Sequence, residues 1–133
     1  MADFGSIIFM SDSNVPERFE VSEDEFAELV EEAFDALPAD MVSRLDNVAF
    51  FIEDDSPEDS PVMLGLYEGV DILDRSEYGF GDLPDRITLF RNPLIDISKD
   101  LDELREQIHI TLVHEIAHYF GIDDDQLHEL GWA

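Results

Sequence analysis

The strongest constraint on this chain is one long helical segment, residues 101–120, whose second half is apolar on almost every side. Asp100 and Glu103 have the spacing of an N-cap and the third residue of a helix, and Gly121 stands where a left-handed residue ends one. The apolar residues of the second half are Ile108, Ile110, Leu112, Val113, Ile116, Ala117 and Phe120. A helix that is apolar all round is a buried helix, so we expect this segment at the centre of the fold.

Shorter elements of both kinds are predicted around that helix. Ser22 and Glu25 have the spacing of a capping box, and apolar residues continue at helical intervals until Pro38 stops the helix. We further expect a helical turn over Asp40–Leu45, strands over Val48–Glu53, Leu64–Tyr67 and Arg86–Arg91, loops over 54–61 and 74–85, and a last turn over Asp124–Leu130. The strand at Val48–Glu53 is almost continuously apolar, which predicts burial on both of its faces.

The length of 133 residues suits one domain, and no repeat or linker divides the chain. We expect residues 1–20 to form a flexible leader and residues 21–133 to form a single domain. The chain has no Cys, which excludes disulfides and any zinc site built on thiolates. Neither a signal peptide nor a membrane-spanning stretch is visible, so we expect a cytoplasmic protein.

The charge balance is strongly acidic and bears on the partners of the protein. The chain carries 34 Asp and Glu against 7 Lys and Arg, which gives a formal net charge of -27. Such a field repels phosphate backbones and anionic membrane surfaces and attracts cations, divalent metals included. We therefore expect neither a nucleic acid nor a membrane as partner, and we expect basic peptides to be favoured over acidic ones.

The chemistry-bearing motif lies inside the long helix and consists of His114, Glu115 and His118. Residues four apart lie about 40° apart around a helix, so the two imidazoles can hold one ion, and zinc is the usual choice. Glu115 is placed to act as general base on a water without holding the ion itself. The alternative is a solvated charged patch, but three ionisable side chains on an apolar helix are costly to bury without a metal or other partners.

We expect a third ligand to come from the few residues that follow the helix. Gly121 permits a positive φ, so the chain can reverse sharply and bring Asp124 back toward the ion. The candidates in this segment are Asp123, Asp124, Asp125, His128 and Glu129. Asp124 has the most suitable register and His128 is the second choice. His109 lies about 140° around the helix from His114, which favours an ordinary role for it.

The whole string, H-E-x-x-H-x-x-G-x-x-D, resembles the metzincin motif with Asp in place of the third His, as in snapalysin-type peptidases. Further stretches resemble a small bacterial family of MMP-like zinc metallopeptidases, or mini-zincins: EFAELVEEAFDALP, NVAFFIED, LGLYEGV, LPDRITLFRNP and TLVHEIAHYFGIDDDQLHELGW. The resemblance covers roughly residues 20–133. It implies a minimal zincin-like α+β fold, with a small mixed sheet packed on an N-terminal helix and a long active-site helix. It also implies His114, His118 and Asp124 as zinc ligands and Glu115 as general base.

Two positions depart from those families. Metzincins have a Met-turn beneath the metal, whereas the last Met of this chain is Met63, upstream of the motif. Tyr119 stands where relatives have a second His, on a side of the helix that faces away from His114.

These observations predict a zinc metalloendopeptidase that hydrolyses peptide bonds, with Zn²⁺ as cofactor and a peptide or protein as substrate. Zincins pair an extended substrate with a strand that borders the cleft, and the strand segment Ile87–Phe90 is our candidate for that edge. Tyr67 or Tyr78 is a candidate for an additional oxyanion donor.

Two other functions are weighed against the peptidase. A metal-dependent ribonuclease family has a related pattern, but it has Gly where this chain has Glu115, and the charge opposes RNA binding. The other alternative is a latent or non-catalytic metal-binding module of the same fold. The presence of Glu115 favours chemistry over that alternative, because a pseudo-enzyme is expected to lose its general base.

Overall fold

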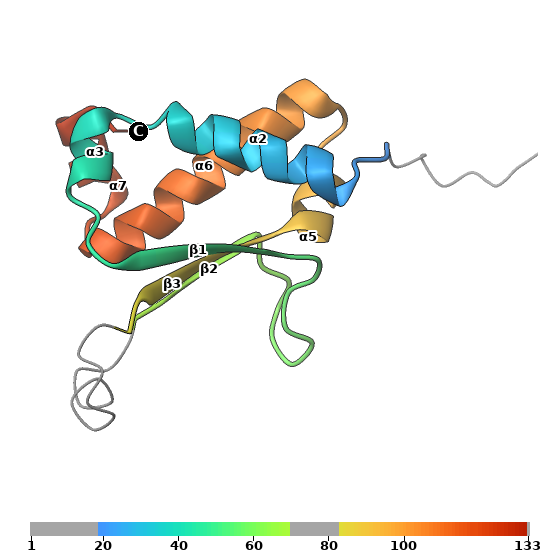
Figure 1. The fold of residues 1–133 in the computed structure, drawn as a ribbon, viewed down its shortest axis with the longest axis horizontal. Coiled ribbons are helices and arrows are strands. Elements are labelled where there is room, and N and C mark those ends of the chain that lie inside the picture. The colour runs from blue at the N-terminus through green and yellow to red at the C-terminus, as the bar shows by residue number, and fades with distance from the viewer. Residues whose placement is uncertain (1–18, 70–82, 133) are drawn as a thin grey trace, which may run out of the picture.

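A computed structural model describes residues 19–69 and 83–132 of the chain (Figure 1). The leader predicted for residues 1–20 lies almost entirely outside the described residues, as does most of the loop predicted for 74–85. The elements in chain order are α2 (Glu23–Asp35), α3 (Ala39–Ser43), β1 (Val48–Glu53), β2 (Gly65–Glu68), β3 (Asp85–Phe90), α5 (Arg91–Asp96), α6 (Leu101–Phe120) and α7 (Asp124–Leu130). The predicted mixture of helices and strands is therefore confirmed, and α5 is an additional element.

The long helix α6 begins and ends at the residues that its caps predict. The Asp100 carboxylate accepts a hydrogen bond of 2.8 Å from the backbone N–H of Glu103, which satisfies one of the unpaired donors of the first turn. Gly121 ends the helix in the left-handed conformation, with φ 72°. Its N–H and that of Ile122 donate to the last carbonyls of the helix, so the end of α6 is closed without side-chain help.

The capping box predicted at the start of α2 is also confirmed. The Ser22 hydroxyl accepts from the Glu25 N–H, and the Glu25 carboxylate accepts from the Ser22 N–H, each at 3.1 Å. Phe26, Leu29 and Ala33 are buried along one side of α2. Because these residues recur at helical spacing, α2 presents one continuous apolar face to the core.

The sheet is mixed and has the strand order β1-β3-β2 in the described chain. β1 pairs parallel to β3 from Val48 opposite Asp85 to Glu53 opposite Phe90, and β2 pairs antiparallel to β3. β3 is therefore the central strand, and the expectation that Ile87–Phe90 forms an edge is wrong. A strand that is hydrogen-bonded on both sides has no backbone groups left for a substrate, so the free edges belong to β1 and β2.

The expectation that β1 is buried on both faces is also wrong. The second half of β1 is exposed, and Phe51 and Ile52 are each 38% accessible. As an edge strand, β1 is covered by helices on one face only, where Phe34 of α2 packs edge-on against Phe50. On the other face the Arg86 guanidinium lies 4.1 Å from the centre of the Phe51 ring. This cation–π contact shields part of an apolar surface that no helix covers.

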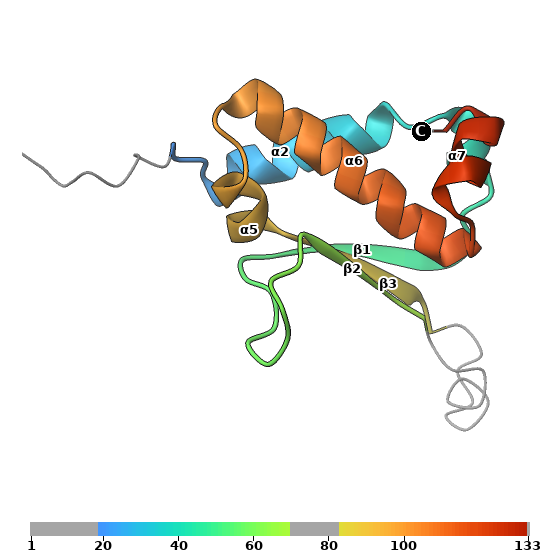
Figure 2. The same ribbon diagram turned by 180° about the vertical axis from the view of Figure 1, so that it is seen from behind.

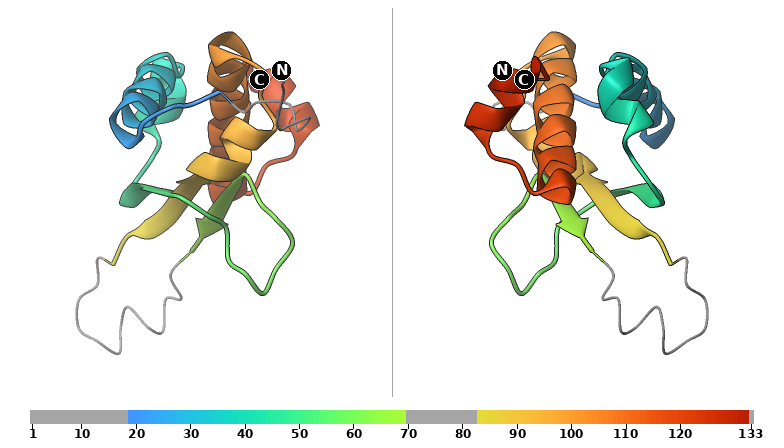
Figure 3. Two further views of the ribbon diagram at one scale, coloured as in Figure 1. Left: turned by 90° about the vertical axis from the view of Figure 1, so that its right-hand side faces the viewer. Right: turned by 90° about the vertical axis from the view of Figure 1, so that its left-hand side faces the viewer.

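The helices lie together on one side of the sheet (Figure 2). Figure 3 shows α6 over the sheet, with α2 and α7 on opposite sides of it. The completely buried side chains of the shared core are Phe26, Met41, Ile87, Leu94, Leu104, Ile108, Leu112 and Ile116. The centre of the fold is therefore α6, as predicted, but α6 is not buried on every side. Ile110 is 39% accessible, and the exposed face that it belongs to carries the histidines of the motif.

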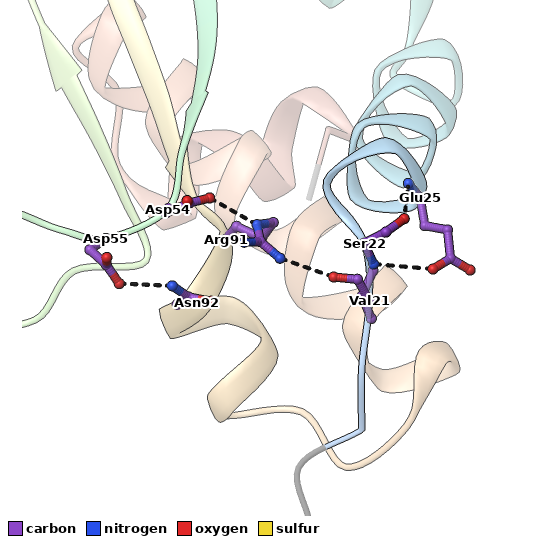
Figure 4. A network of polar contacts seen from close by, with 7 residues as sticks. All are labelled: Val21, Ser22, Glu25, Asp54, Asp55, Arg91 and Asn92. Carbon is purple, nitrogen blue, oxygen red and sulfur yellow. Dashed lines mark hydrogen bonds and ion pairs between the residues drawn. The ribbon is translucent and has the colours of Figure 1, made fainter.

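A polar network connects the end of β1, the start of α5 and the chain that enters α2 (Figure 4). Arg91, the first residue of α5, contacts Asp54 through Nε at 2.9 Å and donates a second hydrogen bond to the Val21 carbonyl. Asn92 donates from Nδ2 to Asp55 at 2.9 Å. The end of β1 and the chain entering α2 are thereby held to the same turn of α5. No helix within residues 19–69 and 83–132 has the length and apolar character needed to cross a membrane.

Candidate metal centre

The two histidines of the motif lie one turn apart on the exposed face of α6. The side chains of His114 and His118 are 51% and 64% accessible, respectively. The burial pattern of the helix explains this placement, because Leu112, Val113, Ile116 and Ala117 turn toward the core. The helix thus presents two imidazoles to solvent from a backbone that is fixed by the packing of its opposite side.

Asp124 is brought back to His114 by the turn that follows α6. Its Oδ1 atom lies 3.5 Å from Nε2 of His114. Gly121 reverses the chain, and α7 then starts at Asp124 with Asp123 as its N-cap. The Asp123 carboxylate accepts from the Gln126 N–H at 2.9 Å, so Asp123 stabilises α7 instead of facing the histidines. Of the two neighbouring carboxylates, Asp124 is therefore the one in contact with the motif.

Glu115 is the buried member of the motif, since its side chain is only 11% accessible. It lies between α6 and β2, and its Oε1 atom is 3.2 Å from Nδ1 of His118. Gly65 of β2 makes this position possible. A Cβ atom at residue 65 would lie 2.8 Å from Cγ2 of Thr111 and 3.1 Å from Cγ of Glu115. Gly65 was not among the site residues predicted from the sequence, although a glycine inside a strand is a known signal of close backbone approach.

The donor atoms suit zinc in kind, and one pair of them suits it in spacing. Two ligand atoms about 2.1 Å from one tetrahedral zinc ion lie roughly 3.4 Å apart. The distance of 3.5 Å between His114 and Asp124 fits such a shared ion. His118 contacts Glu115 through Nδ1, and its Nε2 makes no hydrogen bond with the residues described. Within residues 19–69 and 83–132, the candidates lie as two pairs, and no group of three or more converges on one point.

A pocket opens beside His114 and Asp124, between α6 and α7. Its volume is about 180 Å³. It is lined by His109, Ile110, Val113, His114, Asp124, Leu127 and His128. His128, the second choice as ligand, lies in this pocket, and its imidazole makes no hydrogen bond or ion pair with a described residue. His109 also lines this pocket, although it lies about 140° around α6 from His114. The two residues share the pocket because α7 lies beside this part of α6.

Tyr67 and Tyr119 make hydrogen bonds within the fold. The Tyr67 hydroxyl donates to Oδ2 of Asp85 at 2.8 Å. Tyr78 lies outside the described residues. The Tyr119 hydroxyl accepts from the Asp46 N–H and donates to the Asp46 carbonyl, both at 3.0 Å. Tyr119 thereby ties the last turn of α6 to the chain entering β1.

Comparisons with known proteins identify a family and a similar solved structure. No curated protein matches the chain. A solved structure of a conserved hypothetical protein from T. thermophilus is similar, with 26% identity and a TM-score of 0.54 over 75% of this chain and 94% of that one. The model of a family described as zincin-like metallopeptidases matches residues 45–132, which include the whole helix α6 and α7. The chain therefore belongs to the zincin-like metallopeptidase family.

Proposed function

We propose that the protein is a zinc-dependent endopeptidase whose ion is held by His114, His118 and Asp124. The observation that carries the proposal is the distance of 3.5 Å between Nε2 of His114 and Oδ1 of Asp124, which suits two ligands of one tetrahedral ion. Membership of a metallopeptidase family supports the same reading. The donor set of two imidazoles and one carboxylate leaves one tetrahedral position for a water or substrate oxygen.

Zinc, when bound, supplies Lewis acidity that makes a water easier to deprotonate and a carbonyl easier to attack. In this proposal Glu115 accepts the proton of the attacking water and later donates it to the leaving amine. Its position supports that role, because its side chain is buried where α6 meets Gly65 of β2 and its carboxylate lies beside His118. Nδ1 of His118 lies 3.2 Å from Oε1 of Glu115, so the two side chains are already in hydrogen-bond contact.

β2 replaces Ile87–Phe90 as the candidate strand for substrate pairing. In the described chain, β2 pairs with β3 along one edge only, and it passes directly over Thr111 and Glu115 of α6. An extended peptide added to the other edge of β2 would run past the motif and present its carbonyls there. The net charge of -27 favours basic peptides over acidic ones at the encounter stage.

The test compares zinc-loaded wild type with Glu115→Gln on a proteome-derived peptide library. Bound zinc is measured in both proteins. We expect cleavage by the wild type, loss of cleavage in Glu115→Gln by a factor of about 100 or more, and equal zinc content. Equal cleavage by the two proteins would show a contaminating peptidase. Zinc retention without cleavage by either protein would contradict the proposal and favour a metal-binding module.

A further inference from the structure

Of the two free edges of the sheet, that of β1 is the longer and the more apolar. β1 has six residues and β2 has four, and in the described chain β1 pairs with β3 only. Edge strands usually carry a charged residue, a proline or a bulge that prevents pairing with another chain. β1 reads VAFFI before its first charge at Glu53, and its register with β3 is continuous. This edge is therefore open to the addition of a further strand.

The backbone groups that face the free edge follow from the pairing with β3. The Asp85 N–H donates to the carbonyl of Asn47, so residue 47 directs its carbonyl toward β3. Successive residues of a strand direct their backbone groups to opposite sides. Val48, Phe50 and Ile52 therefore direct their N–H and C=O groups away from β3. These are the donors and acceptors that an added strand would contact.

Exposed apolar side chains flank this edge on both faces of the sheet. Phe51 lies on the face opposite the helices, where Arg86 covers part of its ring, and Ile52 lies on the other face. Each of the two is 38% accessible. Phe50 packs against Phe34 of α2, so the helices cover the first part of β1 and leave its end uncovered. The side chains of an added strand would have an apolar neighbour on either face.

Charge decides which kind of chain can pair here. Five exposed carboxylates stand directly at the end of β1: Glu53, Asp54, Asp55, Glu58 and Asp59. A second copy of the chain would bring a net charge of -27 against another of -27. Residues 1–18 of the chain itself carry three acidic residues against one Arg, so they lack the complementary charge as well. A segment rich in Lys or Arg is attracted instead.

We propose that the free edge of β1 is a docking surface for an extended, basic segment of a partner protein, which adds to the sheet as a further strand. The backbone groups of β1 provide the pairing, and Phe51 and Ile52 contact apolar residues of that segment. The carboxylates of residues 53–59 attract its Lys and Arg side chains. The surface lies across the sheet from β2, and it requires neither zinc nor Glu115.

The first test uses defined peptides and measures binding alone. The 133-residue protein is titrated, with a chelator present, against a labelled seven-residue peptide of alternating lysine and valine, and binding is followed by fluorescence anisotropy. We expect the corresponding glutamate–valine peptide to bind more weakly by roughly tenfold or more. Methylation of the backbone nitrogens that face β1 should weaken binding by a similar factor, because each methyl group removes a donor. Both sets of alternate nitrogens are tested, since the N–H groups of a strand alternate in direction.

Two variants at one position test the edge itself. Ile52→Pro removes an N–H that points away from β3 and leaves the pairing with β3 in place, which is where an edge strand tolerates proline. Ile52→Ala shortens the same side chain and keeps the N–H. We expect Ile52→Pro to lose affinity for the lysine–valine peptide by roughly tenfold or more, and Ile52→Ala to stay within about fivefold of the wild type. Urea unfolding checks that both variants are folded, and the methylated peptides test the same pairing on the unaltered protein.

The outcomes separate this partner from other occupants. No binding of the lysine–valine peptide, equal binding to folded Ile52→Pro and wild type, or no effect of either methylation would overturn the proposal. Equal binding of the glutamate–valine peptide would overturn the basic partner. A dimer in sedimentation that is lost in Ile52→Pro would assign the edge to a second copy. Peptide binding that occurs only in Ile8→Asp/Phe9→Asp would assign it to the chain's own leader.

Discussion

At the residue scale, Asp124 is the position that separates a metal centre from a chance contact between an imidazole and a carboxylate. We expect Asp124→Ala to weaken zinc binding by more than the roughly 10–100-fold that is typical of losing an outer-shell partner, because it removes one of three ligands. The matched control is Asp125→Ala, which removes the same charge from the next residue of α7. Both affinities can be measured by competition with a chelating dye.

His128→Ala tests the second choice for the third zinc ligand. Because Oδ1 of Asp124 lies 3.5 Å from Nε2 of His114, and His128 has no such contact with His114 in the described chain, we expect this variant to keep its zinc. Loss of zinc in His128→Ala with retention in Asp124→Ala would reverse the choice of third ligand.

Gly65 yields a second residue-scale prediction, about the position of Glu115. Gly65→Ala places a methyl group 2.8 Å from Cγ2 of Thr111 and 3.1 Å from Cγ of Glu115. We expect a loss of about 1–3 kcal/mol in the free energy of unfolding from overpacking, together with lower peptidase activity because Glu115 is displaced. Urea unfolding and peptide cleavage would measure the two effects.

A compensating substitution tests the cause of that loss. Thr111→Ser removes the Cγ2 atom that makes the closest approach. Gly65→Ala/Thr111→Ser should therefore recover much of the stability that Gly65→Ala alone loses, relative to Thr111→Ser. If the double variant is no more stable than additivity predicts, the contact with Thr111 is not what makes Gly65→Ala costly.

At the element scale, the turn after α6 can be tested through its glycine. Gly121 has φ 72° and Gly131, at the end of α7, has φ 76°, and a Cβ at either position would meet no atom within 4 Å. Each Gly→Ala variant should therefore lose stability by about 1–2 kcal/mol through backbone strain alone. Zinc affinity should fall only in Gly121→Ala, since that turn sets the position of Asp124.

The two variants serve as controls for each other because they carry the same substitution in the same backbone conformation. Equal zinc affinity in both would indicate that the turn after α6 does not position the third ligand. A loss of zinc affinity in both would indicate that general destabilisation, and not this turn, causes it.

The elements also show how far local sequence predicts this fold. Caps and apolar periodicity are local, so the ends of α6 and the capping box of α2 followed from Asp100, Gly121 and Ser22. Strand order depends on partners distant in sequence, and the pattern of β3 does not reveal that it lies between β1 and β2. The same limit applies to the site. The spacing of His114 and His118 is visible in the helix, whereas the neighbourhood of His109 and His128 depends on how α7 packs.

At the scale of the whole molecule, the charge distribution predicts how stability responds to salt. Only 7 Lys and Arg face 34 Asp and Glu, so most carboxylates have no cation to pair with. Salt bridges that the structure does contain, such as Arg86 with Glu53 and Glu68, are well exposed and contribute little. Repulsion among carboxylates therefore outweighs the attraction that added salt would screen.

We expect the free energy of unfolding to rise when sodium chloride is raised from about 20 mM to 300 mM, because the screening length falls from roughly 20 Å to below 10 Å. Urea is the appropriate denaturant, since guanidinium is itself a salt. The measurement should include a chelator, so that stabilisation by a bound divalent ion is excluded, and potassium chloride should give the same rise as sodium chloride. A fall in stability with salt would mean that the few ion pairs outweigh the net repulsion. A rise with only one of the two salts would indicate binding of a specific ion in place of general screening.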